Sequence, residues 1–465
     1  MLIRFSAQNF RSIGMQPLTL DFVTSSKIRT HPSHICSSDL KAKILRNAVI
    51  YGGNSCGKSN IIKAISFFKA IMTQGRLPQG TTREYCRAGE GHAQTETAFE
   101  IQFEVNGEVY DYTIGCLLAE YRITSECLYR LHPHKQLVFS REEDTTGPTI
   151  TWGPDLLNLS PEEEARKTIY TQDYLNDIDA RLHVPFCCAL SQGKVYPNGS
   201  PLTTLGMVPA WCGMHLQIIT AGQPSPTSEF YLDSKTLDDV AAVLASFDTG
   251  ISAINKHEIS LDELEKQVDP TTSLMIRNML VQNPPLNDDD NFVITLRGDG
   301  AFIGIERKGL DDPVVTILET EHAGSTSVFQ FGDESDGTRR LFDFMDLLFS
   351  KDTERVFVID EFDRSLHPML TKHFVELFNT VHAADKCQML FTTHESSIMS
   401  LEYYRKDEIW FVDRNDSGCS KLYPLSSFSD LRNDVRLEKN YLDGRFGGVP
   451  VLSSYRSELA VTGED

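Results

Sequence analysis

The chain has 465 residues, of which 40% are hydrophobic and 23% are charged, and its formal net charge is −21. This composition is typical of a soluble globular protein of two or three structural units with a large buried core. No run of about eighteen apolar residues is present, which argues against a membrane span. The acidic balance disfavours nonspecific binding to DNA, although a local basic groove stays possible.

The first residues alternate between apolar and polar side chains, as strands do. Residues 2–5 and 18–22 are therefore predicted strands, and the N-terminus does not resemble a signal peptide. The ten cysteines include no C-x-x-C pair, which disfavours a zinc site. A reducing, cytoplasmic location is the simplest expectation.

The most informative segment follows a predicted strand at residues 47–51. It reads GGNSCGKS, and an apolar helix begins at its Lys58-Ser59. This is the G-x-x-x-x-G-K-[ST] phosphate loop in its strand–loop–helix setting, so we expect Lys58 to reach the terminal phosphates of ATP and Ser59 to ligate Mg²⁺. The alternatives are a glycine-rich turn that only caps a helix, and a redox role for Cys56. The predicted nucleotide-binding residues here are Gly52, Gly53, Asn54, Ser55, Cys56, Gly57, Lys58, Ser59 and Asn60.

Two further regions are predicted before the second set of motifs. Residues 1–152 form an N-terminal lobe rich in strands, in which residues 99–105 and 109–114 flank an Asn-Gly turn as a hairpin. Residues 153–325 form an α+β insertion without sustained heptad repeats. The insertion is expected to contain a helix that starts at Pro161, a helix at 237–244, an acidic loop at 284–290 and a hairpin at 292–296 and 302–305.

The third region, residues 326–430, opens with a polar element at the start of an apolar helix. The element reads DESDGTRR, and the helix is predicted at residues 341–349. A small hydroxyl at Ser335 and a glycine at Gly337 predict a second phosphate-binding site, most simply for ATP bound to another subunit. An ordinary helix N-cap is the alternative.

Two buried strands follow in the same region. Residues 356–359 end at Asp360, which is placed to hold Mg²⁺, and Glu361, which is placed to polarise the water that attacks the γ-phosphate. Residues 388–393 end at His394, which is expected to hydrogen-bond the γ-phosphate. A solvated acidic turn and a structural histidine are the alternatives.

This order of motifs resembles the ABC-type ATPase heads of the RecF, SMC and Rad50 group. The matching stretches are GGNSCGKS, ESDGTRR, VFVIDEFDRSLHP and LFTTHE, together with the opening NFRSI. The resemblance implies an α/β fold with a β-rich first lobe, a sheet core that carries the phosphate loop, and a mixed insertion. It also implies that Arg11 lies near the nucleotide and that residues 363–367 form a loop that crosses a dimer interface.

Within that group the chain looks most like the compact ATPases of bacterial defence loci, such as RloA, the AriA subunit of PARIS systems and the AbiL kind. The tail, residues 431–465, is too short for a nuclease domain and contains a stretch similar to the endings of that subgroup. The resemblance implies a cytoplasmic ATPase that oligomerises with shared ATP sites. It would control a separate effector, a TOPRIM or HEPN-like nuclease, in response to a phage-derived trigger.

Two rival interpretations stay open. A RecF-like repair ATPase would clamp duplex DNA, and a transporter motor is disfavoured by the long insertion and the β-rich first lobe. The glutamine that provides a second contact to Mg²⁺ in such heads is not assigned, because Gln102 lies in a predicted strand.

Overall fold

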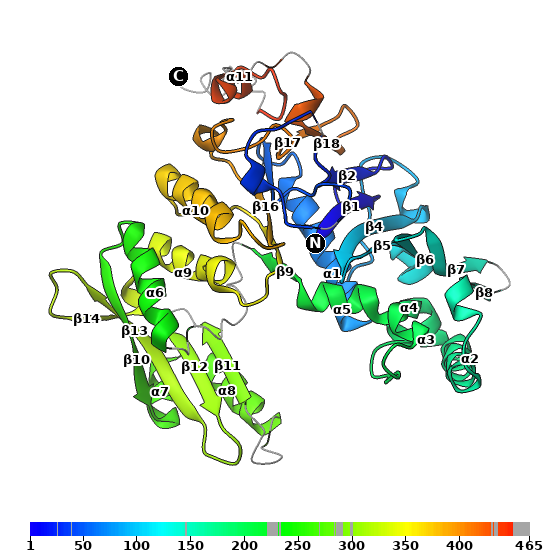
Figure 1. Cartoon of the computed structure of the whole chain (residues 1–465), viewed down its shortest axis with the longest axis horizontal. Helices are drawn as coiled ribbons and strands as arrows, with labels where there is room; N and C mark the ends of the chain where they lie inside the picture. Colours follow the sequence, from blue (N-terminus) through cyan, green and yellow to red (C-terminus); the bar gives the residue numbers. More distant parts are fainter. Residues whose placement is uncertain are drawn as a thin grey trace, which may run out of the picture. The chain divides into compact units, whose positions relative to one another are not determined.

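Figure 1 shows the computed structural model of the whole chain. The chain forms two compact units. Unit 1 comprises Met1–Leu2, Arg29–Asn47 and Ala210–Phe391, and unit 2 comprises Ile3–Ile28, Ala48–Pro209 and Thr392–Asp465. The residues that the structure describes are 1–25, 27–38, 40–144, 147–220, 231, 234–268, 270–282, 284, 292–297, 301–428, 431 and 436–449.

Unit 2 contains a seven-stranded sheet in the order β2-β1-β4-β5-β6-β7-β8. The predicted N-terminal strands and the Asn-Gly hairpin are confirmed. Asn106 and Gly107 both have positive φ, 53° and 81°, as a tight two-residue hairpin turn requires. The strands are β1 (Leu2–Gln8), β2 (Leu18–Asp21), β4 (Thr97–Val105), β5 (Glu108–Leu117), β6 (Arg122–His132), β7 (Gln136–Asp144) and β8 (Gly147–Trp152).

One helix packs on this sheet through an aromatic cluster. Helix α1 (Lys58–Gln74) follows the buried strand β3 (Asn47–Gly52). The ring centroid of its Phe68 lies 6.4 Å from that of Phe99 on β4 and 6.1 Å from that of Tyr112 on β5. Full burial of one such side chain stabilises a fold by about 1.5–3 kcal/mol, so this contact fixes the helix that follows the phosphate loop.

The rest of unit 2 places a second strand beside β3. Strand β17 (Ile409–Arg414) pairs in parallel with β3 and antiparallel with β18 (Ser420–Pro424). The predicted helix at Pro161 is confirmed, and a reciprocal capping box between Ser160 and Glu163 begins it. The helices here are α2 (Pro161–Asn176), α3 (Ile178–His183), α4 (Phe186–Ala189) and α11 (Leu437–Leu442), and α5 (Met207–Met214) crosses into unit 1.

Unit 1 contains three parallel strands with helices beside them. Strand β15 (Val356–Ile359) pairs in parallel with both β16 (Gln388–Thr392) and β9 (Leu216–Ile219). Every residue of β15 is buried, as expected of a central strand in a parallel sheet. Helices α9 (Asp336–Phe349) and α10 (Pro368–Val381) each contribute an aromatic ring to the cluster around Phe362, which immediately follows the acidic residues after β15.

A second sheet of unit 1 is formed mostly by strands of the predicted insertion. Its order is β10-β13-β12-β11, and β14 also pairs with β13. The predicted helix at 237–244 and the hairpin strands are confirmed, whereas residues 285–290 of the acidic loop and the turn at 299–300 lie outside the described residues. The elements are α6 (Ser234–Ser246), β10 (Ile251–Ile259), α7 (Leu261–Gln267), α8 (Pro270–Gln282), β11 (Phe292–Arg297), β12 (Phe302–Arg307), β13 (Val314–His322) and β14 (Val328–Gln330).

The predicted α/β fold class is confirmed by these elements, with a β-rich sheet beside the phosphate loop and a mixed insertion. The predicted domain boundaries at 152, 325 and 430 stay predictions. The compact units divide the chain between Pro209 and Ala210, so helices α2, α3 and α4 of the predicted insertion lie in unit 2. Among the described helices, none is long and apolar enough to cross a membrane.

Candidate nucleotide site

The shape of the phosphate loop depends on glycine at two positions. Gly57 has φ 113°, which residues other than glycine rarely adopt, and a Cβ atom there would lie 1.9 Å from the Ser420 hydroxyl oxygen. A Cβ atom on Gly52 would lie 2.6 Å from the backbone oxygen of Val412 on β17. The loop is therefore confined by strands β17 and β18, and larger residues at either position would displace it.

The ammonium group of Lys58 lies over this loop. Its Nζ donates to the backbone oxygens of Gly52 at 2.7 Å and Gly53 at 3.2 Å, and the side chain is buried. It also lies 3.4 Å from Nδ1 of His394. Because an ammonium group only donates, His394 accepts through Nδ1. Two predicted site residues that are 336 positions apart are thus brought together.

His394 is positioned by the backbone around it. Strand β16 ends just before it, and the N–H of Thr393 donates to the oxygen of Ile50 on β3 at 3.1 Å. The Thr393 hydroxyl in turn accepts from the N–H of Glu395 at 3.0 Å. These contacts keep His394 at the carboxyl end of its strand, where open α/β sheets bind ligands.

A chain of hydroxyl groups connects the loop to the N-terminal strand region. The Ser420 hydroxyl donates to the backbone oxygen of Cys56 at 2.6 Å and lies 2.7 Å from the Ser12 hydroxyl oxygen. Ser12 also accepts from the side-chain amide of Asn60 at 2.7 Å. This network therefore connects the predicted residue Asn60 to the phosphate loop. Ser59 beside it lies in the first turn of α1.

The other predicted loop residues differ in exposure. Asn54 and Ser55 are exposed, and Ser55 has φ 63°, which turns the backbone at the tip of the loop. Cys56 is buried, and burial raises the pKa of its thiol despite the nearby Lys58 ammonium. A high thiol pKa argues against the redox role that the sequence left open for Cys56.

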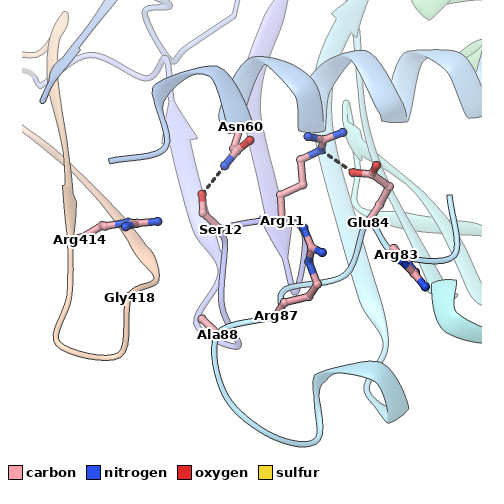
Figure 2. A pocket seen from close by; sticks show the side chains of 9 residues that line it. All are labelled: Arg11, Ser12, Asn60, Arg83, Glu84, Arg87, Ala88, Arg414 and Gly418. Carbon is pink, nitrogen blue, oxygen red and sulfur yellow. Dashed lines mark hydrogen bonds and ion pairs between the residues drawn. The ribbon is translucent and has the colours of Figure 1, made fainter. Parts of the chain in front are cut away.

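Arg11 lies in a cavity at the start of α1 (Figure 2). Its backbone is left-handed, with φ 52°, and its N–H donates to the backbone oxygen of Glu84 at 2.7 Å. Its side-chain Nε lies 2.5 Å from the Glu84 carboxylate. Asn60 lines the same cavity, so Arg11 lies close to the phosphate-loop helix, and its place near the nucleotide stays a prediction.

In unit 1, the two acidic residues follow β15 directly. Asp360 donates its N–H to the oxygen of Ile219 on β9 at 2.9 Å, and Glu361 has φ 51°, so the chain turns sharply there. The guanidinium of Arg340 on α9 lies 3.4 Å from the backbone oxygens of both residues. Arg340 is buried and also stacks on the ring of Phe344, which makes it a fixed support of the acidic turn.

The predicted signature residues lie at the start of α9. The Ser335 hydroxyl accepts from the N–H of Thr338 at 3.1 Å, so the N-cap alternative is confirmed for Ser335. A Cβ atom on Gly337 would lie 2.8 Å from the backbone oxygen of Ser365, so glycine is needed where α9 meets the loop at 363–367. A phosphate contact by Ser335 and Gly337 stays a prediction.

Glu334 immediately precedes the N-cap residue Ser335 and is hydrogen-bonded by side chains of the insertion sheet. It is buried, and it accepts from the His322 ring at 2.8 Å and from the Thr320 hydroxyl at 2.5 Å, both on β13. This contact could not be predicted from the sequence. No local pattern signals it, because the residues meet only after β13 pairs with its neighbours.

Two other polar groups have structural roles. Gln102 lies in β4, and its side-chain amide donates to Glu100 at 3.2 Å, so the second Mg²⁺ contact stays unassigned. His382, Asp385 and Cys387 are close enough together to suggest a metal site. Both ring nitrogens of His382 already form hydrogen bonds, one with Asp385 at 2.7 Å and the other with the backbone oxygen of Leu347 at 2.6 Å. His382 therefore connects the end of α10 to α9.

Comparison with known proteins gives one family match and distant structural likenesses. A family model described as "AAA domain, putative AbiEii toxin, Type IV TA system" matches residues 234–400. No curated protein matches the chain. Two similar solved structures are titled "Crystal structure of the SmcHead bound to the C-winged helix domain of ScpA" and "SMC head domain from Thermotoga maritima".

The two structures cover nearly the whole chain at low identity. The first shares 12% identity over 91% of this chain and 97% of its own, with a TM-score of 0.43. The second shares 14% identity over 91% of this chain and 98% of its own, with a TM-score of 0.34. The family match and the phosphate loop together support an ATP-binding ATPase.

Proposed function

We propose that this protein is an ABC-class ATPase that binds ATP with Mg²⁺ and hydrolyses it to ADP and phosphate. The observation that carries the proposal is the phosphate loop of unit 2, where Lys58 lies over the loop carbonyls and beside His394. In this place the ammonium can stabilise charge on the terminal phosphates, and His394 can report whether the γ-phosphate is present.

The remaining residues of the reaction are assigned by their chemistry. Ser59 and Asp360 offer hydroxyl and carboxylate oxygens, which are the hard ligands that Mg²⁺ prefers. Mg²⁺, when bound, neutralises charge on the β- and γ-phosphate oxygens. Glu361 polarises the attacking water as a general base, and Arg340 positions it through the backbone of the acidic turn.

The ATPase is further proposed to oligomerise, with Ser335 and Gly337 of one subunit contacting ATP held by Lys58 of another. The N-terminus of α9 supports this assignment, because helix N-termini attract phosphate and Ser335 is exposed there. ATP binding would then close the assembly, and hydrolysis would open it.

The biological role we propose is control of a separate toxic effector, a nuclease, in antiphage defence. The support is the family match, whose description names an AbiEii-type toxin system, together with the resemblance of the motifs to defence ATPases. In this role the protein is a sensor and scaffold, and the conformational change driven by ATP is its output.

The experiment has two parts. Steady-state hydrolysis of ATP by the purified chain tests the enzyme, and sizing by light scattering with and without ATP tests the oligomer. Turnover that requires Mg²⁺ and an ATP-dependent increase in mass support the proposal. A fixed monomer whose turnover rises strongly with duplex DNA would favour the DNA-clamping alternative.

A further inference from the structure

The cavity that contains Arg11 has a size suited to a small molecule. Its volume is about 510 Å³, within the range of ligand pockets. The loop that carries Arg83 and Arg87 lines one part of it, and Arg414, at the end of β17, lines another. Figure 2 shows Arg414 extending toward Ser12, with Arg87 between Ser12 and Glu84.

The charge of this cavity is opposite to that of the chain. Four arginines and one glutamate line it, which leaves three positive charges, whereas the chain has a net charge of −21. Glu84 pairs with Arg11. The guanidinium groups of Arg83, Arg87 and Arg414 form no hydrogen bond or ion pair with any residue in the described parts of the chain. These groups are therefore available to an anionic ligand.

The cavity begins where the phosphate loop ends. Asn60, in the first turn of α1, and Ser12, to which it donates, both line it. Val412 pairs with Gly52, the first residue of the loop, so Arg414 lies two residues beyond that point on β17. The loop and the cavity are thus neighbouring parts of one site in unit 2.

We infer that this cavity binds a phosphate group carried on the ribose of the bound nucleotide, outside its 5′-phosphates. The inference rests on the proposed function. In the inferred pose, the terminal phosphates lie at Lys58, the nucleotide runs along the first turn of α1, and its ribose lies toward Arg87 and Arg414. A ribose and a base are neutral, whereas a guanidinium fork matches a phosphate in two hydrogen bonds. The ligand class is therefore a free nucleotide phosphorylated at the 2′ or 3′ position.

A nucleic acid strand offers the same chemistry, because its 5′ nucleotide has a phosphate on the ribose. The observations favour the free nucleotide for two reasons. The cavity has the volume of a small-molecule site, and a chain with a net charge of −21 repels an extended phosphate backbone. The strand is therefore an outcome of the test and not the proposal.

The test compares ligands with and without a phosphate on the ribose. Calorimetry gives the dissociation constants of AMP, adenosine 2′,5′-bisphosphate and adenosine 3′,5′-bisphosphate. A 5′-triphosphorylated dinucleotide is compared with ATP in the same way. We expect at least one bisphosphate to bind about tenfold or more tightly than AMP, the effect of a charge-assisted hydrogen bond. This ratio should fall toward one in an Arg87→Ala/Arg414→Ala double variant.

The matched control is Arg76→Ala, which removes an arginine of unit 2 that pairs with Asp179 outside the cavity. It should keep the wild-type ratio. Because the side chains of Arg87 and Arg414 are exposed, we expect the double variant to fold, and its thermal unfolding temperature checks this. Equal binding of AMP and both bisphosphates would overturn the inference. A ratio that survives in the folded double variant would do the same, as would a gain seen only with the dinucleotide.

Failure of this inference is distinguishable from failure of the proposed function. If the wild-type chain binds ATP and Lys58→Ala does not, the phosphate loop stands whatever the bisphosphates do. If neither ATP nor the bisphosphates bind, the proposed function fails, and this inference fails with it.

Discussion

Ser420 donates a hydrogen bond of 2.6 Å to the backbone oxygen of Cys56, although 364 positions separate the two residues. This contact ties strand β18 to the phosphate loop. Ser420→Ala removes it and leaves the Cys56 carbonyl without that donor, at a cost of about 1 kcal/mol. We therefore expect ATP to bind about fivefold more weakly. The control is Ser417→Ala in the neighbouring turn, and equal ATP affinity of both variants would contradict the role of Ser420.

Glu361→Gln should keep ATP and Mg²⁺ binding and slow hydrolysis by about 10²- to 10⁴-fold, because an amide keeps the shape of the side chain and loses the base. It should also prolong ATP-bound oligomers. Single-turnover hydrolysis and sizing in ATP measure both effects. Glu376→Gln, an exposed change on α10, is the control, and normal turnover in Glu361→Gln would remove Glu361 from catalysis.

Ser335→Arg should leave ATP binding by the isolated subunit intact and suppress hydrolysis, because a bulky side chain at the start of α9 blocks closure onto a neighbouring subunit. Ser335→Ala also removes the N-cap, at a cost of about 1 kcal/mol of stability, but it adds no bulk. It therefore separates the loss of the N-cap from the block to closure. We expect Ser335→Ala to retain much more activity than Ser335→Arg.

Mixing Ser335→Arg with Lys58→Ala subunits tests whether sites are shared. In a two-site dimer, one composite site then carries both lesions and the other carries neither, so part of the activity should return. The shared-site model is refuted if hybrids form and recover no activity although the Ser335→Arg subunits bind ATP normally.

Cys56 should react slowly with iodoacetamide at neutral pH. Burial raises the pKa of its thiol, so the reactive thiolate fraction is smaller than in the unfolded chain. The alkylation rate of Cys56 should also rise with pH, and the midpoint of this rise should lie at a higher pH than in the unfolded chain. Mass spectrometry of the peptide that contains Cys56 measures both rates. Faster alkylation in the native protein would restore the redox interpretation.

The sequence predicted those parts of the fold and site that local pattern determines. The strand, loop and helix around Lys58 are contiguous, and the hairpin at Asn106 and Gly107 is specified by two residues. Glu361 is predicted as the base because an apolar run ends beside it, and this role stays a prediction. In each of these cases the signal lies within about ten residues, which is the reach of periodicity and turn chemistry.

Contacts between distant segments could not be predicted in this way. Ser420 meets the loop only because β17 pairs with β3, and a short stretch at 216–219 gives no sign that it pairs in parallel with β15. Likewise, His322 reaches Glu334 through the insertion sheet. Sheet pairing over long separations depends on the whole packed structure, which a single sequence does not display.

The most direct test of the central claim is calorimetric titration of Mg²⁺·ATP into the wild-type chain, Lys58→Ala and Lys63→Ala. Lys63 lies on the same helix, and its side chain is exposed, so it controls for loss of a positive charge on α1. We predict that the wild type and Lys63→Ala bind ATP with the same affinity and that Lys58→Ala shows no measurable binding. Wild-type affinity in a folded Lys58→Ala variant would contradict the assignment of residues 52–59 as the nucleotide site.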